Sequence, residues 1–357
     1  MSILSGFFSN DLAIDLGTVN TIVYAPDQGV LLNEPSMLAL HKYSGDVLGV
    51  GSEALKLLGR EPNDTEIHRP IRRGAIDEFD VSQKFLRELL NRVHNTGHSK
   101  RTHVVIGVPG SSTPLERRSV RDAARDAKVG RVDLIDEGLA AGLGAGLDFL
   151  NEQAHLVVDI GGGTTNIAIL ASGGIITSVS LPAAGQAMDE AIRDYLRVRY
   201  AVVLGERTAE NVKKELGMAG DVNLNQPKEM QIVGKQLRNG AALPLTVTSQ
   251  EVRVALEPVL SEIISAVRRV IEDSKPEVTA DTYYTGIILT GGGALLQGMP
   301  QRLQNELNLE VTVPEDPLTT VAFGAGRLLD DPEKLQRATL RLDVPAWQSA
   351  EKLIVNW

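Results

Sequence analysis

The chain has 357 residues, a formal net charge of −10 and no cysteine. Its length allows two domains of ordinary size with well-filled cores. The acidic balance argues against nucleic acid as the main partner, because phosphate backbones bind basic surfaces. The lack of cysteine excludes disulfides and thiolate chemistry and favours a reducing cytoplasm. No run approaches the ~20 apolar residues of a membrane span, and the first residues lack the basic start and long apolar core of a secretion signal.

The N-terminal segment MSILSGFFSND allows two interpretations. Ile3, Leu4, Phe7 and Phe8 fall on one helical face, with the serines largely opposite. A short helix in the membrane interface, formed by residues 1–8, is one interpretation. A packed or disordered N-terminus is the other. The segment has no lysine or arginine to meet anionic lipid, which counts against the membrane interpretation.

A segment near the N-terminus is repeated in the second half of the chain. LAIDLGTVNTIVYAPDQGV (residues 12–30) aligns with LVVDIGGGTTNIAILASGG (residues 156–174), so that Asp15 falls on Asp159. Each copy is typical of a buried strand, a tight Gly/Thr turn, a second strand and a further turn. A hairpin repeated once per half predicts two α/β domains of one fold, related by duplication.

The remaining elements follow from hydrophobic periodicity. They are expected, in chain order, over residues 82–94 (helix), 104–109 (strand), 114–129 (helix), 247–274 (helix) and 286–292 (strand). The third of these helices opens with Thr248 and Glu251 in capping-box spacing, and Pro258 is expected to bend it. Each half therefore reads as a mixed sheet with helices on its faces.

Both hairpin turns carry residue types that suit phosphate. Glycine lets the backbone approach a ligand closely, while threonine and successive backbone amides donate to phosphate oxygens. The aspartate at the strand end can hold Mg²⁺ through water. A single turn of this kind is often only structural. Two of them in equivalent repeat positions predict a pair that clamps a phosphate chain in a cleft between the domains.

A third turn lies in TGGGALLQGMPQRL (residues 290–303). A strand runs into three glycines, and a helix is expected directly after them. This arrangement places helix amides and the positive end of the helix dipole beside a ligand. A plain strand-to-helix turn is the alternative. Beside two phosphate turns, contact with the nucleoside part of the same ligand is favoured.

These three turns, in this order, are the signature of the actin-like ATPase superfamily, and the chain resembles the MreB family of bacterial actins over nearly its whole length. The matching stretches are FFSNDLAIDLGTVNT, VLLNEPS, LERRSVRDAA, VVDIGGGTTNIAIL, GERTAENVKKELG, ILTGGGALL and EDPLTTVAFGAG. The resemblance implies an α/β actin-like fold of two ribonuclease-H-like domains, with ATP and Mg²⁺ in the cleft. In the implied partition, domain I comprises residues 9–150 and 325–345 and contains a small subdomain near 36–69. Domain II comprises residues 151–324 and contains a small subdomain near 186–249. Residues 346–357 form a C-terminal tail.

The resemblance also implies a set of ligand contacts at matching positions. Asp15 and Asp159 are implied to organise Mg²⁺ through water. Nucleotide contacts are implied for the first turn (Gly17, Thr18, Val19 and Asn20), the second turn (Gly161, Gly162, Gly163, Thr164 and Thr165), the ribose and base (Glu210, Asn211, Val212 and Lys213) and the adenosine (Gly291, Gly292, Gly293, Ala294 and Leu295).

The residue implied to act in hydrolysis is Glu137, in LIDEGLAAGLGAG. MreB proteins carry a glutamate here, before a helix of small residues near the γ-phosphate. Its implied role is to orient or polarise the attacking water, with Thr164 also contacting that water. The alternative is that Glu137 caps the helix, and both roles can hold together.

Some positions depart from the MreB pattern. Gly138 stands where the family has proline, and the loop at 94–103 lacks the apolar pair that many members place near the membrane. Ala184-Gly185-Gln186 replaces Gly-Gly-Asp, and Arg72-Arg73-Gly74 replaces Lys-Asp-Gly. These departures keep open a paralogue with another cargo, such as the actins that align magnetosomes.

The function implied by the resemblance is that of a slow cytoskeletal ATPase that assembles head to tail into paired protofilaments. The process implied is cell-shape determination through cell-wall synthesis, in the cytoplasm at the inner face of the membrane, with membrane proteins of the elongation machinery as partners. A non-polymerising nucleotide switch and a small-molecule kinase are the alternatives from other classes. A chaperone would need a substrate domain after the ATPase, and a kinase would need an aspartate base for which no motif is present.

Overall fold

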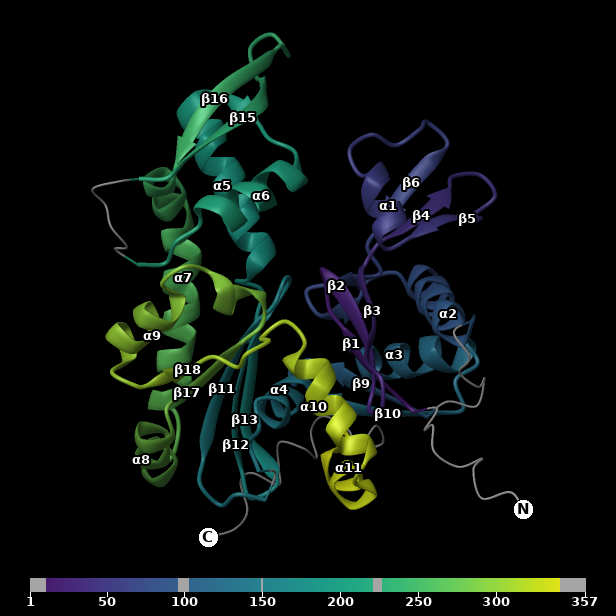
Figure 1. Ribbon diagram of the computed structural model, residues 1–357, viewed down its shortest axis with the longest axis vertical. Coiled ribbons are helices and arrows are strands. Elements are labelled where there is room, and N and C mark those ends of the chain that lie inside the picture. The colour runs from purple at the N-terminus through teal and green to yellow at the C-terminus, as the bar shows by residue number, and fades with distance from the viewer. Residues whose placement is uncertain (1–10, 96–102, 149, 221–226, 341–357) are drawn as a thin grey trace. The chain divides into compact units, whose positions relative to one another are not determined.

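The computed structural model describes residues 11–95, 103–148, 150–220 and 227–340, which form two compact units (Figure 1). Unit 1 runs to Glu152 and includes residues 170–178 and the chain from Thr319 onward. Unit 2 comprises residues 153–169 and 179–318. The N-terminal segment 1–8, the tail 346–357 and most of the loop at 94–103 lie outside the described residues.

The main sheet of unit 1 has the strand order β10-β9-β1-β2-β3. Strands β1, β2 and β3 form an antiparallel meander, and β9 and β10 continue the sheet in parallel from β1. Their bounds are β1 (Leu12–Leu16), β2 (Asn20–Ala25), β3 (Gly29–Pro35), β9 (His103–Val108) and β10 (Arg131–Asp136). Strands β1 and β9 are almost entirely buried, as expected for parallel strands that are covered on both faces.

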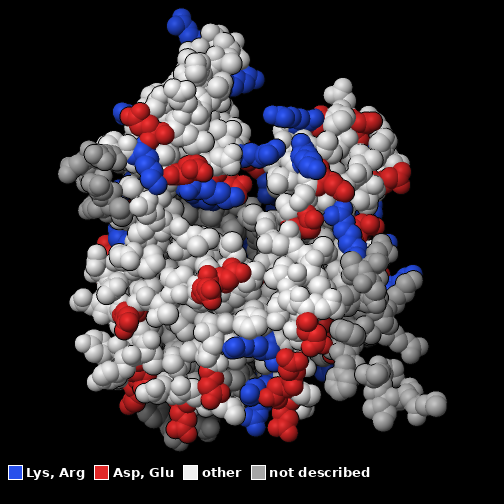
Figure 2. Space-filling view, in the orientation of Figure 1, with Lys and Arg blue, Asp and Glu red and all other residues white. Residues whose placement is uncertain are grey.

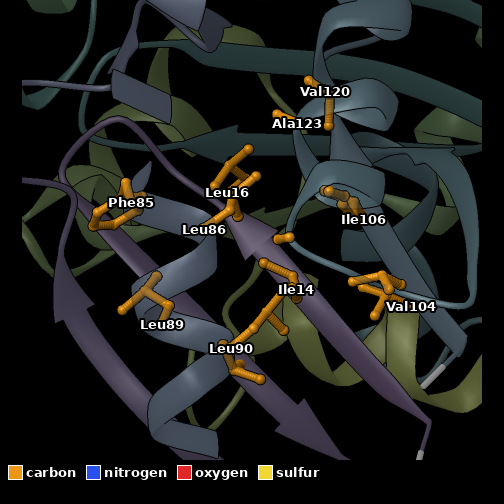
Figure 3. Packing of buried hydrophobic residues seen from close by; sticks show 14 of the residues in the cluster. Ile14, Leu16, Phe85, Leu86, Leu89, Leu90, Val104, Ile106, Val120 and Ala123 are labelled. Atoms are coloured by element: carbon orange, nitrogen blue, oxygen red, sulfur yellow. The ribbon is translucent and has the colours of Figure 1, made fainter. Parts of the chain in front are cut away.

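Helices cover both faces of this sheet. On one face lie α2 (Phe79–Asn95) and α3 (Pro114–Asp126), and Figure 3 shows their apolar side chains packed against Ile14 and Ile106 of the sheet. On the other lie α4 (Glu137–Gly144) and α10 (Thr320–Leu329), which is followed by α11 (Pro332–Ala338). Small residues let α4 and α10 approach closely, since a Cβ on Gly324 would overlap the carbonyl oxygen of Ala140.

Smaller elements of unit 1 lie between β3 and α2. A three-stranded sheet has the order β5-β4-β6 and packs on α1 around a small core of its own. A two-stranded ribbon follows it. The bounds are β4 (Leu38–His41), β5 (Val47–Val50), α1 (Ser52–Leu57), β6 (Thr65–His68), β7 (Ile71–Arg72) and β8 (Ala75–Ile76).

The main sheet of unit 2 has the order β13-β12-β11-β17-β18. Its strands are β11 (His155–Ile160), β12 (Thr165–Ala171), β13 (Gly174–Leu181), β17 (Ile287–Thr290) and β18 (Val311–Thr312). A smaller sheet contains β14 (Val202–Val203), β15 (Glu229–Gln236) and β16 (Ala242–Thr248). The helices are α5 (Gly185–Tyr200), α6 (Glu206–Leu216), α7 (Ser249–Glu272), α8 (Pro276–Thr285), the short 3₁₀ helix η1 (Gly292–Leu295) and α9 (Met299–Leu307).

The two main sheets share one topology, which confirms the duplication predicted from the repeat. In each, a hairpin and third strand are joined to two further parallel strands. Asp15 lies opposite Gly107 in the first parallel pair, and Asp159 lies opposite Thr290 in the second. The two aspartates therefore occupy the same place in the two sheets.

Most elements lie where the sequence predicts them. Helices α2, α3 and α7 cover the predicted segments, and Thr248 and Glu251 form both hydrogen bonds of the capping box. Helix α7 continues through Pro258 to Glu272. One expectation is wrong: no α-helix starts directly after the three glycines. Two of the three glycines, Gly292 and Gly293, belong to η1. Helix α9 begins only at Met299, directly after Gly298, whose backbone is in the left-handed conformation.

The surface carries both signs of charge. Figure 2 shows acidic and basic side chains interspersed on the visible face of the described residues. Among the described helices, none is long and apolar enough to cross a bilayer.

Candidate functional site

The first turn, between β1 and β2, is held by the residue that follows β3. The Ser36 hydroxyl donates to the carbonyl oxygen of Gly17 at 2.5 Å, and the Ser36 amide donates to that of Val19 at 2.7 Å. Ser36 itself is fully buried, and its two hydrogen bonds satisfy carbonyl groups of a partly buried turn. The backbone of the turn is thus fixed before any ligand arrives.

Two side chains of this turn were predicted to contact phosphate. Thr18 Oγ1 accepts a hydrogen bond from the Gly74 amide at 3.0 Å, in the turn between β7 and β8. A hydroxyl that accepts can still donate its proton, so Thr18 remains able to donate to an anion. Asn20 Nδ2 donates to Asn33 Oδ1 at 2.8 Å, which commits one of its two amide protons.

Two acidic residues lie at the carboxyl end of the unit 1 sheet. Asp15 is paired with Gly107 across β1 and β9. A Cβ built on Gly107 would lie 3.3 Å from Cγ of Glu137, so the Glu137 side chain packs on the same stretch of β9. Unit 1 therefore brings together Asp15 and Glu137, two residues that the sequence assigns to magnesium and to hydrolysis.

The residue that caps α4 is Asp136, not Glu137. Asp136 Oδ1 accepts from the Leu139 amide at 3.1 Å, while Glu137 is the first residue of the helix and is buried. The alternative of Glu137 as the cap is therefore wrong. Burial raises the pKa of Asp136, while the amides of Leu139 and Gly138 partly offset this rise. The sequence contained the signal that was missed, because an aspartate before a helix is a preferred cap.

The second turn, between β11 and β12, is bonded to the start of α5. The Gly161 amide donates to the Thr164 carbonyl at 2.9 Å and closes the turn. The amides of Gly185 and Gln186 donate to the carbonyls of Gly161 and Gly162 at 3.1 and 2.7 Å. These three hydrogen bonds engage the carbonyl groups of Gly161, Gly162 and Thr164 and the amide of Gly161. The glycine turn is therefore held in one conformation.

The two threonines of the second turn differ in their surroundings. Thr165 is fully buried, and its hydroxyl donates to the Ala183 carbonyl at 2.6 Å. Thr21 holds the equivalent place in unit 1, where its hydroxyl pairs with that of Ser36 at 2.9 Å. Thr164 is only partly buried. The Thr165 side chain thus serves the fold, whereas Thr164 can reach a ligand.

Helix α6 joins this site through one side chain. Lys213 Nζ donates to the Gly185 carbonyl at 2.9 Å and pairs with Asp189 at 2.9 Å. Burial raises the pKa of Asp189, and the charge of Lys213 opposes that rise. The three other residues of α6 predicted to contact the ligand are not bonded to the second turn in this way. Glu210 is paired with Lys214, Asn211 is exposed and Val212 is in the core.

The third turn lies against Asp159. Gly291 has φ +78°, and a Cβ there would overlap both Asp159 Oδ1 and the Ile160 carbonyl. Burial raises the pKa of Asp159 to about 6, although a hydrogen bond from Asn166 lowers it. A bound cation would restore the charged form, so this carboxylate suits a place near magnesium. The described residues contain no group of three His, Asp or Glu side chains that could hold a metal alone.

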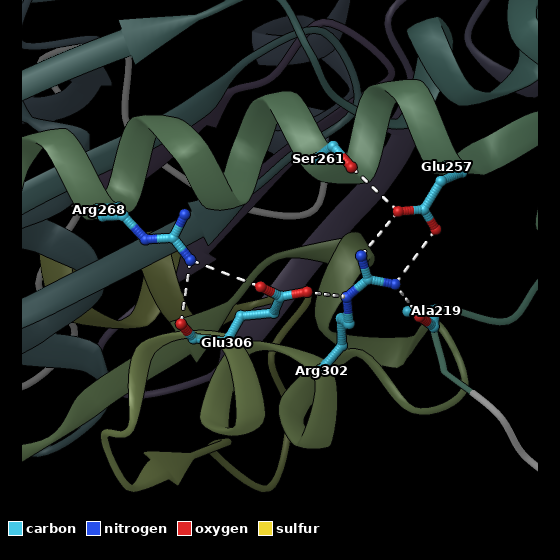
Figure 4. A network of polar contacts seen from close by, with 6 residues as sticks. All are labelled: Ala219, Glu257, Ser261, Arg268, Arg302 and Glu306. Carbon is cyan, nitrogen blue, oxygen red and sulfur yellow. Dashed lines mark hydrogen bonds and ion pairs between the residues drawn. The ribbon is translucent and has the colours of Figure 1, made fainter.

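The segment after Gly291 presents one apolar side chain. Ala294 is buried, whereas Leu295 is 59% exposed. Arg302 of α9 connects this helix with α7 and with the segment that follows α6 (Figure 4). Its guanidinium forms a two-pronged pair with Glu257 of α7 at 3.1 and 2.7 Å and donates to the Ala219 carbonyl at 3.2 Å. The segment that follows α6 is thereby tied to the helix that follows the third turn.

Unit 2 thus brings together most of its predicted residues. The second turn, Lys213 and Asp159 with the third turn meet through direct hydrogen bonds or close backbone approach. By contrast, the Asn211 side chain is exposed and Val212 belongs to the core. Three supporting residues were not predicted, and each acts across a long sequence separation: Ser36, Gly74 and Asp189.

Known proteins match this arrangement over most of the chain. A sequence model described as MreB/Mbl protein matches residues 9–337. The cell shape-determining protein MreB of Escherichia coli K12 is 40% identical over 332 residues, which cover 91% of this chain and 94% of that protein. The cell shape-determining protein Mbl of Bacillus subtilis 168 is 38% identical over 333 residues, which cover 93% and 99%.

A solved structure agrees with the fold. The crystal structure of MreB5 of Spiroplasma citri bound to ADP has a TM-score of 0.85 and 31% identity, and the match covers 91% of this chain and 97% of that chain. The same protein has also been crystallised with AMPPNP. The α/β actin-like fold expected from the three turns is thereby confirmed.

Proposed function

Because the chain belongs to the MreB/Mbl family, we propose that it is a filament-forming bacterial actin that binds ATP with Mg²⁺ and helps to determine cell shape. The relatives at 40% and 38% identity are named for cell-shape determination, and MreB5 binds ADP and AMPPNP. The observation that carries the proposal is the duplicated glycine turn, with a strand-end aspartate at the same place in each unit.

The proposed nucleotide contacts follow the turns. In unit 1 the phosphates contact the backbone of residues 17–20 and the Thr18 hydroxyl. In unit 2 they contact the amides of residues 162–163 and Thr164, while Lys213 holds the second turn in place through Gly185. The exposed Leu295 offers an apolar surface to the base, beside glycines whose backbone a ligand can approach closely.

The proposed metal contacts are Asp15 and Asp159, each through water. Bound Mg²⁺ would neutralise phosphate charge, which is the chemistry that it supplies to nucleotide sites. Asp159 would be ionised in that state, since a nearby cation lowers the pKa that burial raises. Asp15 is only partly buried, and therefore keeps water close to its carboxylate.

For hydrolysis we assign Glu137 as the residue that orients the attacking water, with Thr164 as a second contact. Glu137 stands at the first position of α4, where helix amides face outward from the N-terminus. Asp136 satisfies one of those amides and so fixes the start of the helix. The turnover is slow, because hydrolysis times the disassembly of the polymer.

The assembly that we propose is a head-to-tail filament, paired with a second protofilament. A head-to-tail contact is heterologous and does not close, so it generates an open polymer. We place the filament in the cytoplasm at the inner face of the membrane, with residues 1–8 as the membrane contact and membrane proteins of the elongation machinery as partners.

Sedimentation and electron microscopy test this proposal. The purified protein is expected to pellet and to show paired filaments with Mg-ATP or Mg-AMPPNP, and to pellet less with Mg-ADP. Liposomes with anionic lipid separate membrane binding from assembly: the filaments should align on them, and deletion of residues 1–8 should abolish the alignment while filaments persist. Failure to assemble with any nucleotide, at any salt concentration, would refute the filament.

A further inference from the structure

Two short segments of unit 2 run side by side: residues 217–219, which follow α6, and residues 296–297, which follow η1. Met218 forms an isolated parallel bridge with Gln297, and the Ala219 amide donates to the Gln297 carbonyl at 2.8 Å. We call these two segments the junction. It links α6 to the third turn.

The junction is closely packed. A Cβ built on Gly217 would overlap Cδ1 of Leu296 and the carbonyl oxygen of Lys213. Met218 and Leu296 are buried, and Ala219 is fully buried. Buried carbonyl groups need a hydrogen-bond partner, because water does not reach them freely. The Ala219 carbonyl is therefore a point at which the junction depends on a side chain from another element.

That side chain is Arg302, which α9 places beside the junction (Figure 4). Its Nη1 donates to the Ala219 carbonyl at 3.2 Å and to Glu257 Oε2 at 3.1 Å, and its Nη2 donates to Glu257 Oε1 at 2.7 Å. Its Nε donates to Glu306 Oε1 at 3.1 Å. All three nitrogen atoms of the guanidinium are thus engaged, so the group is held in one orientation.

Glu257 of α7 directs Arg302 toward the junction. The Ser261 hydroxyl donates to Glu257 Oε1 at 3.0 Å, so the carboxylate that faces Arg302 is itself oriented. The hydrogen bond from Arg302 holds the pKa of Glu257 below its usual range, and Glu257 is therefore charged at neutral pH. The Arg302 side chain is only 18% exposed. A two-pronged pair of this kind is stronger than an ordinary surface ion pair.

We propose that Arg302 is a positioning residue for the nucleoside part of the ligand, and that it sets how strongly the protein prefers a nucleoside triphosphate to a bare polyphosphate. This inference rests on the proposed nucleotide site, in which α6 and the third turn are assigned to the nucleoside. Arg302 acts on neither directly. It fixes the spacing between them, because it holds the junction that joins them.

The phosphate part of the proposed site has supports of its own. Lys213 Nζ is held by the Gly185 carbonyl and by Asp189, both at 2.9 Å and both on α5. The second turn is closed by its own first amide and is bonded to the start of α5. These bonds do not pass through the junction. A looser junction should therefore leave the second turn in place.

Ligand binding by the full chain tests the inference, with Mg-ATP and with inorganic tripolyphosphate and Mg²⁺ as the two probes. Arg302→Lys keeps the positive charge but lacks the planar fork, so it cannot bond Glu257 and the Ala219 carbonyl in the same way. We expect the affinity for ATP to fall about tenfold, within the range of changes that act through packed networks. The affinity for tripolyphosphate should stay unchanged. Equal losses for the two probes, or no loss for ATP, would overturn the inference.

Arg268→Lys is the matched control. Arg268 of α7 donates to the carbonyl and to the carboxylate of Glu306 at 3.0 and 3.5 Å, so it belongs to the same network, but Figure 4 shows it away from Ala219. Both probes should bind this variant as they bind the unchanged protein. If Arg268→Lys weakens ATP binding as much as Arg302→Lys does, the effect belongs to the charge network and the junction has no such role.

A second variant approaches Arg302 from its partner. Glu257→Gln leaves Arg302 in place and removes the charge that directs it. The affinity for ATP should fall again while that for tripolyphosphate does not, and the factor should be smaller than in Arg302→Lys, because the bond to Ala219 can persist. Loss of affinity for tripolyphosphate in this variant would contradict the separation of the two parts of the site.

Hydrogen exchange supplies a readout that needs no ligand. The Ala219 amide bonds across the junction, so its exchange should be at least ~10-fold faster in Arg302→Lys than in the unchanged protein or in Arg268→Lys. Equal exchange in the three proteins would overturn the inference and would leave the proposed nucleotide site intact. An unchanged protein that binds neither probe would instead refute the proposed function, and this inference with it.

Discussion

The hairpins β1–β2 and β11–β12 have the same topology but different surroundings. Asp15 and Asp159 occupy equivalent places, each at the end of the strand that pairs in parallel with the next one. Beyond this point the sheets diverge. In unit 1 the neighbouring strand carries Gly107 and lies beside Glu137, whereas in unit 2 it runs from Thr290 directly into Gly291.

The consequence is a different environment for each carboxylate. Gly291 has no side chain, so its backbone closes over Asp159, and burial raises the pKa of that carboxyl to about 6. Asp15 remains partly exposed. In unit 2 the site therefore consists of glycine backbone and one buried carboxylate. In unit 1 the strand-end carboxylate is accompanied by the acidic pair Asp136 and Glu137. A duplicated scaffold can thus specialise through the residues that follow its strands.

The largest expected effect comes from adding a methyl group at the third turn. Gly291→Ala places a Cβ against backbone at a residue with φ +78°, so neither the conformation nor the space is available. We expect the free energy of unfolding to fall by at least about 4 kcal/mol, together with loss of ATP binding. Urea unfolding and nucleotide titration measure the two effects.

Gly29 in unit 1 provides the control. Its φ is +76°, and nothing lies within 4 Å of a Cβ built there. Gly29→Ala should therefore carry only the conformational cost, about 1 kcal/mol, with unchanged ATP binding. Equal losses in the two variants would mean that the close approach to Asp159 is unimportant.

The second prediction concerns the two aspartates. The pKa of Asp159 rises from 3.8 to about 6 on folding. At roughly 1.4 kcal/mol per pKa unit, the ionised carboxylate destabilises the nucleotide-free fold at pH 7 by about 3 kcal/mol. Asp159→Asn should therefore raise the free energy of unfolding by up to that amount while weakening Mg-ATP binding. Asp15→Asn should weaken binding too, with a change in stability below about 1 kcal/mol.

The same difference predicts a pH dependence. A carboxyl whose folded pKa is raised binds its proton more tightly in the folded state, so the stability that it contributes is present below about pH 4 and is lost as the pH rises to about 6. Asp159→Asn should make this fall smaller, while the buried carboxyls Asp136 and Asp189, whose pKa is also raised, keep their share of it. Unfolding curves across this range, without nucleotide, compare the variants. A fall of the same size in Asp159→Asn and in the unchanged protein would assign it to other groups.

Local signals in the sequence were enough to predict the repeat, the three turns and the main helices. Glycine and threonine after a buried strand specify a turn by themselves, and an apolar period specifies a helix. The contacts that shape the site lie beyond such signals. Gly74 bonds Thr18 across 56 residues, and Lys213 bonds Gly185 across 28. Both depend on packing between elements, which no local pattern encodes.

A local signal can also be read for the wrong residue. Asp136 and Glu137 are adjacent, and both are acids at the start of a helix. The structure separates them, because the Asp136 side chain turns back to the helix amide while Glu137 packs along β9. Side-chain direction at a strand-to-helix junction follows from backbone geometry, and the order of residues alone does not decide it.

The third prediction uses this adjacent pair. Glu137→Gln keeps the size of the side chain and removes its charge, so ATP binding should persist while phosphate release slows by about 100-fold. Asp136→Asn keeps a good helix cap, and its phosphate release should stay within about threefold of the unchanged protein. Single-turnover assays with Mg-ATP measure both rates. If Asp136→Asn is the slower variant, the two roles have been assigned in the wrong order.

The smallest expected effects come from the hydroxyl groups that support each hairpin. Ser36→Ala removes a bond to the Gly17 carbonyl and the pairing with the Thr21 hydroxyl, and Thr165→Val removes one bond to the Ala183 carbonyl. Thr165→Val should lower the free energy of unfolding by about 1 kcal/mol, the net contribution of one buried hydrogen bond, and Ser36→Ala by about 2 kcal/mol. Their effects on nucleotide should differ, because Gly17 belongs to the proposed phosphate turn and Ala183 lies outside the second one. We expect ATP affinity to fall several-fold in Ser36→Ala and to stay unchanged in Thr165→Val. A loss of affinity in Thr165→Val alone would show that the second turn is the more sensitive of the two, because the Gly185 amide that bonds this turn lies two residues after Ala183.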